Sequence, residues 1–145
     1  MKISTKGIYA VRFMVFLAEK GKAELVPLKE IAEATGISRK YLEQIASTLA
    51  GAQLVRSVRG ASGGYRLARS AEGISLLDVL TITEGSLAPV DYLDDIAGKP
   101  DPGEPRYEIF VWKGLHDVIT DYLAGISLQD VVDRSRDMDI DSYSI

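Results

Sequence analysis

The chain has no cysteine among its 145 residues. Disulfide bonds, cysteine-ligated zinc fingers and cysteine-bound iron–sulfur clusters are therefore excluded. Histidine is almost as scarce, since His116 is the only one, and no motif pairs it with a serine or a carboxylate. Nucleophilic and metal-dependent catalysis needs such a constellation of side chains. The composition predicts a protein that is not an enzyme, with no catalytic residues and no metal ligands.

Long apolar runs are also missing, because no stretch approaches the ~20 residues that a membrane span requires. The basic start and apolar centre of residues 1–21 resemble a signal peptide in outline. Arg12 interrupts the apolar run, however, and no small-residue cleavage site follows it. A helix over Thr5–Glu19, ended by Gly21, is the better interpretation. We expect a cytoplasmic protein that makes no contact with a membrane.

Acidic residues outnumber basic residues in the whole chain, which has a net charge of −4 and a pI of about 5.0. Residues 1–70 nevertheless contain 12 Lys and Arg against 5 Asp and Glu, a net charge of +7. Residues 71–145 contain 5 against 16, a net charge of −11. Chance segregation of surface charge is the weaker explanation for so large a contrast. A basic N-terminal part is typical of a module that binds a polyanion such as DNA.

The stretch Leu28–Leu49 has the pattern of two short helices joined by a tight turn. Gly36 supplies the positive φ that the corner needs, and Ser38 suits the N-cap of the second helix. The second helix is polar on one face, and its other face carries an apolar stripe of Leu42, Ile45, Ala46 and Leu49. This pattern predicts a helix-turn-helix whose second helix enters a DNA groove. An ordinary αα-hairpin remains the alternative from this stretch alone.

A β-hairpin is predicted directly after the helix-turn-helix. Residues 54–59 and 65–67 are rich in strand formers, and a glycine-rich turn separates them. A hairpin in this position is a wing, with Arg59 and Arg66 flanking its tip. A phosphate-cradling loop is a poor interpretation of the glycine cluster, because neither a helix nor Gly-Lys-Ser/Thr follows it. Pro27 is expected at the first position of the first helix of the helix-turn-helix, and Gly51 at the end of its second helix.

The second half begins with a capping box, Ser75–Asp78, that predicts a helix to about Thr83. Residues 84–105 follow as a loop that contains four of the five prolines. A loop of this length is usually functional or disordered. We favour a charged, solvated segment over a metal site, because its carboxylates lack the regular spacing of a calcium loop. Those carboxylates are Asp91, Asp94, Asp95, Asp101 and Glu104.

Helical periodicity returns at Arg106 and predicts a helix to Ala124 with a wide apolar face. We expect this face to form a homodimer interface, and packing on the first helix is the alternative. A last short helix capped by Ser127 and an acidic tail complete the chain. The predicted interface residues are Ile109, Trp112, Leu115, Ile119, Tyr122, Leu123 and Ile126.

Together these elements predict a mainly α-helical fold with a small β-hairpin wing. A winged helix-turn-helix DNA-binding domain is expected over residues 1–83. Residues 84–105 form the loop, and residues 106–145 form a dimerisation helix with a C-terminal tail.

Five segments of the chain together resemble the Rrf-two (Rrf2) family of bacterial winged-helix regulators. They are MKISTKG, YLEQI, VRGASGGY, ISLLDVL followed by EG, and SLAPVD, and they occur in the family's order. Members of this family regulate iron–sulfur cluster biogenesis, respond to nitric oxide or repress cysteine metabolism. The resemblance implies a homodimeric, sequence-specific repressor that binds a palindromic operator in double-stranded DNA.

One departure from the family pattern concerns the cofactor. Cluster-binding members carry three cysteines between the EG motif and the long helix, where this chain has Tyr92, Pro100 and Arg106. We therefore predict DNA binding with no cofactor. The likeness is greatest to members that repress cysteine metabolism, which implies cysteine synthase as a partner enzyme. Two alternatives remain: a regulator of iron–sulfur or redox genes that senses another ligand, and a winged-helix adaptor that binds a protein.

The DNA contacts are predicted from side-chain chemistry and the family likeness. Arg39 and Lys40 are expected to bind phosphates, while Gln44 suits adenine and Glu43 suits a cytosine amino group. The alternative for Glu43 is a solvated helix charge, which Arg39, four residues earlier, could pair. Packing on the first helix is the alternative for the phosphate contact of Tyr41. Arg59 is expected to enter a minor groove. The predicted set is Ser38, Arg39, Lys40, Tyr41, Glu43, Gln44, Ser47, Arg59 and Ser62.

Overall fold

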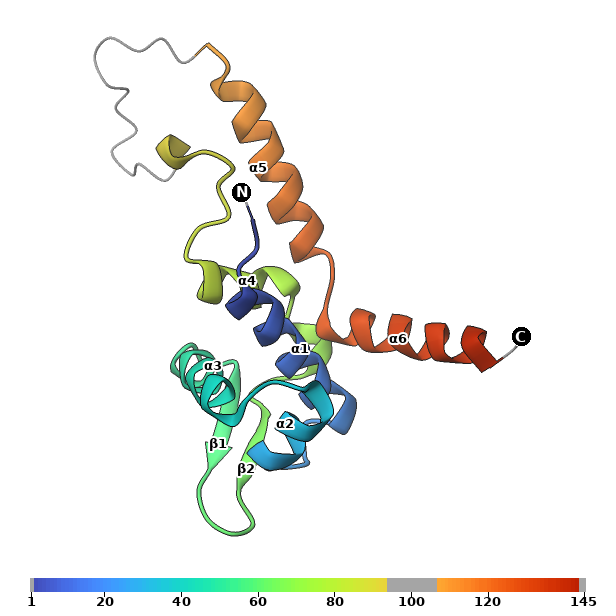
Figure 1. Ribbon diagram of the computed structural model, residues 1–145. Helices are drawn as coiled ribbons and strands as arrows, with labels where there is room; N and C mark the ends of the chain where they lie inside the picture. The colour runs from blue at the N-terminus through green and yellow to red at the C-terminus, as the bar shows by residue number, and fades with distance from the viewer. Residues whose placement is uncertain (1, 94–106, 144–145) are drawn as a thin grey trace.

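A computed structural model describes residues 2–93 and 107–143 (Figure 1). In this part of the chain the protein is predominantly helical, with one small antiparallel sheet. Helices are labelled α, strands β and single 3-10 turns η. The elements in chain order are α1 (Thr5–Lys20), α2 (Leu28–Thr35), α3 (Arg39–Gly51), β1 (Val55–Val58), β2 (Gly64–Leu67), η1 (Ala71–Gly73), α4 (Leu76–Glu84), η2 (Asp91–Leu93), α5 (Ile109–Ala124) and α6 (Leu128–Tyr143). The predicted fold class, mainly α with a hairpin wing, is confirmed.

Helix α1 lies at the centre of the fold, and α2, α3, α4, α6 and β2 all contact it. The hydroxyl of Ser4 caps its first turn by accepting the N–H of Gly7 at 3.0 Å. Phe13, Met14 and Leu17 are buried at helical spacing in the core. Burying side chains of this size contributes roughly 1.5–3 kcal/mol each. The helix predicted over residues 5–19 is confirmed and ends one residue later.

The helix-turn-helix forms as its caps require. Gly36 adopts φ 73°, and the Ser38 hydroxyl accepts the Tyr41 N–H at 3.2 Å. One predicted helix boundary is wrong by one residue. Pro27 is the N-cap of α2 and not its first helical residue, because its backbone is extended with ψ 146°. Gly51 ends α3 as predicted, and Gln53 takes the positive φ of 61° beyond it.

The wing is attached to the start of α2 by a backbone pairing that the sequence patterns did not predict. Val26, in the segment between α1 and α2, exchanges hydrogen bonds of 2.8 and 2.9 Å with Tyr65 of β2. The Tyr65 ring also meets Phe13 edge-on, with ring centroids 6.0 Å apart. The base of the hairpin is therefore held both by α1 and by the segment that leads into α2.

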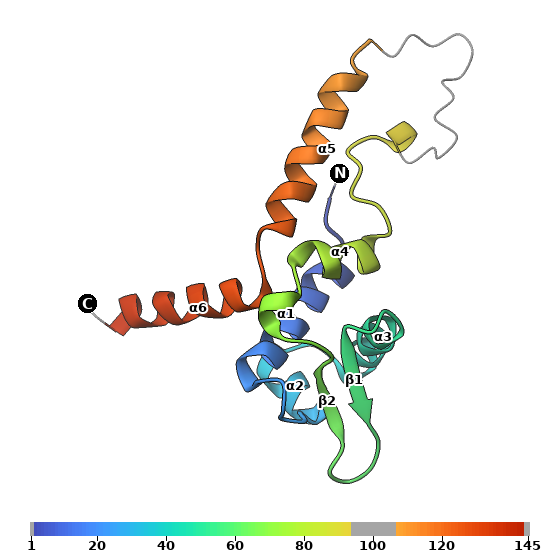
Figure 2. The same ribbon diagram turned by 180° about the vertical axis from the view of Figure 1, so that it is seen from behind.

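The C-terminal half contains the largest difference from prediction. Helix α6 runs for 16 residues, whereas we expected a short helix and an acidic tail. Its first turn is anchored because Leu128 and Val132 are buried in the same core as α1. Beyond them, charges of both signs recur along the helix and favour its continuation. Figures 1 and 2 show α5 and α6 projecting from the body in different directions.

Several other features of this half agree with prediction. Both hydrogen bonds of the capping box between Ser75 and Asp78 are present. Helix α5 ends at Ala124 as predicted, but it begins at Ile109, later than the predicted start at Arg106, which lies outside the described residues. None of the helices in the described part of the chain combines the length and hydrophobicity that crossing a bilayer demands.

Glu84, the last residue of α4, joins that helix to the start of α1. Its carboxylate accepts the Ser4 N–H at 2.5 Å and the Ser4 hydroxyl at 2.6 Å. A Cβ on Gly7 would lie 2.9 Å from the same carboxylate, so the close approach needs glycine there. A carboxylate at a helix N-terminus also interacts favourably with the helix dipole. The opening segment and the EG motif, 80 residues apart, thus meet in one contact.

We expect Glu84→Ala to lower the free energy of unfolding by about 1–2 kcal/mol, because it removes two charge-assisted hydrogen bonds at a partly exposed site. Thermal melting followed by circular dichroism measures the effect. Glu33→Ala, which removes an exposed carboxylate from α2, is the matched control. Equal melting temperatures for the two variants would contradict the role of Glu84.

Candidate nucleic-acid interface

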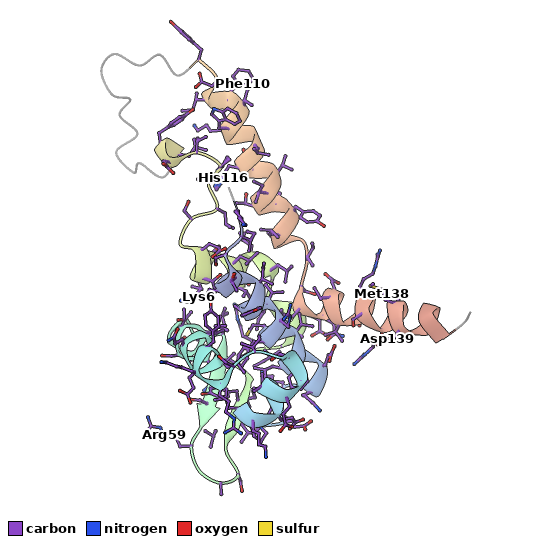
Figure 3. All side chains as sticks on the ribbon, viewed as in Figure 1. Lys6, Arg59, Phe110, His116, Met138 and Asp139 are labelled. Carbon is purple, nitrogen blue, oxygen red and sulfur yellow. The ribbon has the colours of Figure 1, made fainter. Side chains whose placement is uncertain are left out.

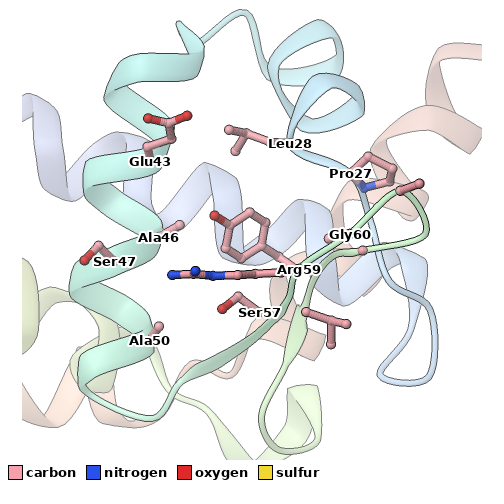
Figure 4. Close-up of a pocket in the computed structure, with 14 residues that line it drawn as sticks. Pro27, Leu28, Glu43, Ala46, Ser47, Ala50, Ser57, Arg59 and Gly60 are labelled. Carbon is pink, nitrogen blue, oxygen red and sulfur yellow. The ribbon is translucent and has the colours of Figure 1, made fainter.

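A groove of about 580 Å³ separates α3 from the wing (Figure 4). One wall is the exposed side of α3, and the other is the hairpin tip together with the entry to α2. In helix-turn-helix proteins the second helix lies in the major groove of DNA, so the surface beside α3 is the one expected to face DNA. Its lining residues are Pro27, Leu28, Glu43, Ala46, Ser47, Ala50, Ser57, Val58, Arg59, Gly60, Ala61, Gly63, Gly64 and Tyr65.

The exposed face of α3 follows from its buried face. The stripe predicted from sequence is buried, so the residues between its members point to solvent. Among the ion pairs of the described residues, which are Lys20–Glu30 and Arg69–Asp78, none involves this face. Glu43 is therefore not paired with Arg39 and is available to the groove. The exposed predicted DNA contacts are Ser38, Arg39, Lys40, Glu43, Gln44 and Ser47.

Tyr41 differs from the other predicted contacts because it is half-buried. Its ring meets that of Tyr9 on α1 edge-on, with ring centroids 5.6 Å apart. Arg12 in turn lies over the Tyr9 ring, at 5.2 Å from its centroid. The packing alternative for Tyr41 is thus present, and its phosphate contact stays a prediction. Arg12 adds a cation beside the recognition helix that sequence reasoning did not assign, although its position inside an apolar helix was a signal.

The wing tip carries two predicted contacts, Arg59 and Ser62, and both are exposed. Arg59 extends from the hairpin across the groove toward α3 (Figures 3 and 4). Gly63 permits the tight turn, since a Cβ there would lie 2.0 Å from the Val58 carbonyl oxygen. Arg66, expected to flank the tip, instead lies opposite Arg56 in the hairpin register.

Of the fourteen groove residues, three were predicted as contacts: Glu43, Ser47 and Arg59. Pro27, Leu28, Ser57 and Tyr65 are among the eleven that were not. They reach the groove because the Val26–Tyr65 pairing brings the start of α2 against the wing. The alternation of side chains along β1 was the only sequence signal for Ser57.

The apolar residues predicted as a dimer interface occupy two sides of α5. Trp112, Ile119 and Leu123 are half-buried on the side that also carries His116, whose Nδ1 lies 3.4 Å from the Leu87 carbonyl oxygen. Ile109 and Ile126 are also half-buried, whereas Leu115 and Tyr122 are exposed.

A continuous apolar face remains exposed on α5, although no residue of this 16-residue helix is fully buried. Val118 is 66% exposed, Tyr122 68% and Phe110 74%. Val111 and Leu115 lie beside them at helical spacing, and we call these five residues the α5 apolar face. The sequence patterns had placed the centre of the apolar stripe on the half-buried side.

The described residues offer no group of three or more His, Asp or Glu placed to hold a metal ion. Of the five loop carboxylates named from the sequence, only Asp91 lies within the described residues, and it is exposed. Asp94, Asp95, Asp101 and Glu104 lie outside them, as do Pro100 and Arg106.

The profile of the Rrf2 family, described as an iron-dependent transcriptional regulator, matches residues 3–134. A thiolate-bound iron centre does not fit this chain, because the sequence has no cysteine and its one histidine contacts a backbone carbonyl.

The chain is similar along most of its length to proteins of the same family. It is 37% identical over 131 residues to the HTH-type transcriptional regulator CymR of Bacillus subtilis, covering 90% of this chain and 89% of CymR. Identity to IscR of Escherichia coli is 34% over 140 residues, covering 97% and 85%. The solved structure of CymR, the global cysteine regulator of B. subtilis, superposes with a TM-score of 0.78 at 34% identity, covering 92% and 98%. This chain belongs to the Rrf2 family of helix-turn-helix transcriptional regulators.

Proposed function

We propose that the protein is a cytoplasmic, homodimeric repressor that binds a palindromic operator in double-stranded DNA without a cofactor. The observation that carries the proposal is the groove between the polar face of α3 and the wing, with Arg59 reaching into it. This groove lies in the half of the chain with a net charge of +7. Neutralising phosphates with such charges supplies most of the affinity of a DNA-binding protein.

The predicted contacts on α3 and the wing divide by the part of DNA that they suit. Arg39 and Lys40, with the N-terminal amides of α3, bind phosphates and set the register of the helix on the duplex. Gln44 lies one turn further along the exposed face, where its amide can pair with adenine. Glu43, unpaired in the groove, accepts from a cytosine amino group and repels misplaced phosphates. Arg59 enters the adjacent minor groove, where the negative potential is high.

The dimer is proposed from the α5 apolar face. A soluble monomer rarely leaves so contiguous an apolar surface exposed, and a second α5 is the occupant that symmetry supplies. The helix is about 24 Å long, enough to present several turns to its partner. Two recognition helices in such a dimer would read half-sites about 34 Å apart, which implies a palindromic operator.

A role in cysteine or sulfur metabolism is proposed from the likeness to CymR, whose solved structure is named as a global cysteine regulator. Cysteine synthase is the partner enzyme that this role implies. The likeness to IscR is nearly as strong and keeps open a role at iron–sulfur or redox genes through a ligand other than a cluster.

Sequencing the DNA that the purified protein selects from a genomic pool tests the proposal most directly. We expect a palindromic motif, and the neighbouring genes identify the regulated pathway. Affinity should fall steeply with salt and should not change after exhaustive chelation. An adaptor that binds only proteins would select no motif and show no salt-dependent binding to generic DNA.

Substitutions at the wing tip and on the exposed face of α3 should have different effects on specificity. Arg59→Ala should weaken binding to every duplex by about 1–3 kcal/mol, because it removes a contact to the minor groove. Gln44→Ala should weaken binding to the selected site more than to generic DNA, because only base contacts carry sequence information. Titrations of labelled duplexes measure both. Equal losses on the two DNAs for Gln44→Ala would remove it from base reading.

A further inference from the structure

The two faces of the wing differ in their surroundings. In the hairpin register Ser57 pairs with Tyr65, and both line the groove beside α3. Arg56 pairs with Arg66 at the next position. Because side chains alternate between the faces of a strand, these two arginines lie on the face opposite that of Ser57 and Tyr65. Arg56 also borders a hollow that Ala50, near the end of α3, helps to line.

A third cation joins them from the turn after α1. Lys22, Arg56 and Arg66 line a second groove of about 430 Å³, together with Ala23, Leu67 and Ala68. Lys22 and Arg56 are exposed and Arg66 is half-buried. We call these three cations the outer wing face.

The charges of the outer wing face are not compensated within the described part of the chain. The ion pairs there are Lys20–Glu30 and Arg69–Asp78. Glu24 lies in the same turn as Lys22 but is a member of neither of these ion pairs. Like charges directly opposite each other destabilise a hairpin. An anion bound between Arg56 and Arg66 would remove this repulsion.

The position of the outer wing face indicates which anion it binds. A minor groove is about 6 Å wide and has a sugar–phosphate strand along each side. A wing that enters it at Arg59 turns one face toward the strand next to α3 and the other toward the far strand. Arg56 lies three residues from Arg59, about 10 Å along β1, within reach of that far strand.

Building on the proposed DNA binding, we propose that Lys22, Arg56 and Arg66 bind phosphates of the strand on the far side of the minor groove that the wing enters. The wing then holds both edges of the groove, and the contact with DNA extends beyond the bases read by α3. An acidic protein is the less suitable occupant, because protein interfaces need a buried apolar or aromatic anchor. The surroundings of the three cations are alanines and the buried Leu67.

The test uses R56Q/R66Q and the selected site flanked by about one helical turn of DNA on each side. We expect on the order of tenfold weaker binding. The slope of log K against log salt should become shallower by about one for each arginine. The melting temperature should not fall, because the substitution removes a like-charge pair. A purely structural role for the arginines would instead lower the melting temperature.

Neutral methylphosphonate linkages locate the contact. Placed on the far strand of the flanking minor groove, they should weaken binding of the unchanged protein but cause no further loss in R56Q/R66Q. The control K113Q/R136Q removes the same charge from exposed positions on α5 and α6 and should match the unchanged protein. Additive losses at every linkage, or unchanged affinity of R56Q/R66Q, would overturn the proposal, the latter favouring an acidic partner. Failure of the proposed function itself is distinct, because the unchanged protein would then bind no duplex.

Discussion

Replacing Val118 by aspartate should convert the protein to monomers and weaken operator binding by at least about 100-fold. Val118 is 66% exposed at the centre of the α5 apolar face, so the folded protomer should tolerate the change. An unpaired carboxylate in a dry interface costs several kcal/mol, and each 1.4 kcal/mol is tenfold in affinity. Light scattering measures the mass, and titration of the selected duplex measures the loss of paired half-site binding.

The control is Lys113→Asp, which places a carboxylate on the polar side of the same helix. It should remain dimeric. Trp112→Asp supplies a second comparison, because Trp112 is half-buried on the side that carries His116. If Trp112→Asp dissociates the dimer while Val118→Asp does not, the interface is the stripe centred on Trp112 that the sequence patterns indicated.

Gly64→Ala should both destabilise the fold and release the wing from the entry to α2. A Cβ on Gly64 would lie 2.5 Å from the Val26 carbonyl oxygen, a backbone atom held by the N–H of Tyr65. Overpacking of this kind costs about 1–3 kcal/mol, and separating the segments would break both hydrogen bonds between them. We expect a lower melting temperature and weaker DNA binding, since Arg59 loses its position beside α3.

Gly51→Ala is the matched control for this prediction. Nothing lies within 4 Å of a Cβ at Gly51, which belongs to the last turn of α3. Alanine is the better helix former, so this variant should melt at the same or a higher temperature. Binding should be measured at a temperature at which all the proteins are folded. A Gly64→Ala protein with unchanged melting and affinity would show that the Val26–Tyr65 pairing does not position the wing.

Local chemistry explains why several elements were predictable. Helix caps act over three or four residues, so both partners of each cap lie close together in the sequence. This holds for Gly36, Ser38 and the Ser75–Asp78 capping box. The apolar period of α3 likewise determines which of its residues remain exposed. For that reason the predicted contacts on α3 lie on one exposed face, apart from Tyr41.

Contacts between distant segments could not be predicted in this way. The Glu84–Ser4 hydrogen bonds and the Val26–Tyr65 pairing join residues that are separated by tens of positions. No periodic pattern marks them, because each is satisfied only after several helices have packed. The same holds for Tyr41, whose burial depends on the Tyr9 ring of another helix.

The sequence by itself determined the winged helix-turn-helix, the family likeness and, through the lack of cysteine, the exclusion of a thiolate-bound cluster. Only the tertiary structure decided which side of α5 stays exposed and that α6 packs its first turn on α1. It also placed Arg56 opposite Arg66 in the hairpin, on the face away from Ser57 and Tyr65. The physical reason is that sequence periodicity shows only that a helix or strand has an apolar and a polar side. Which neighbours cover each side is determined by packing among segments that are far apart in the chain.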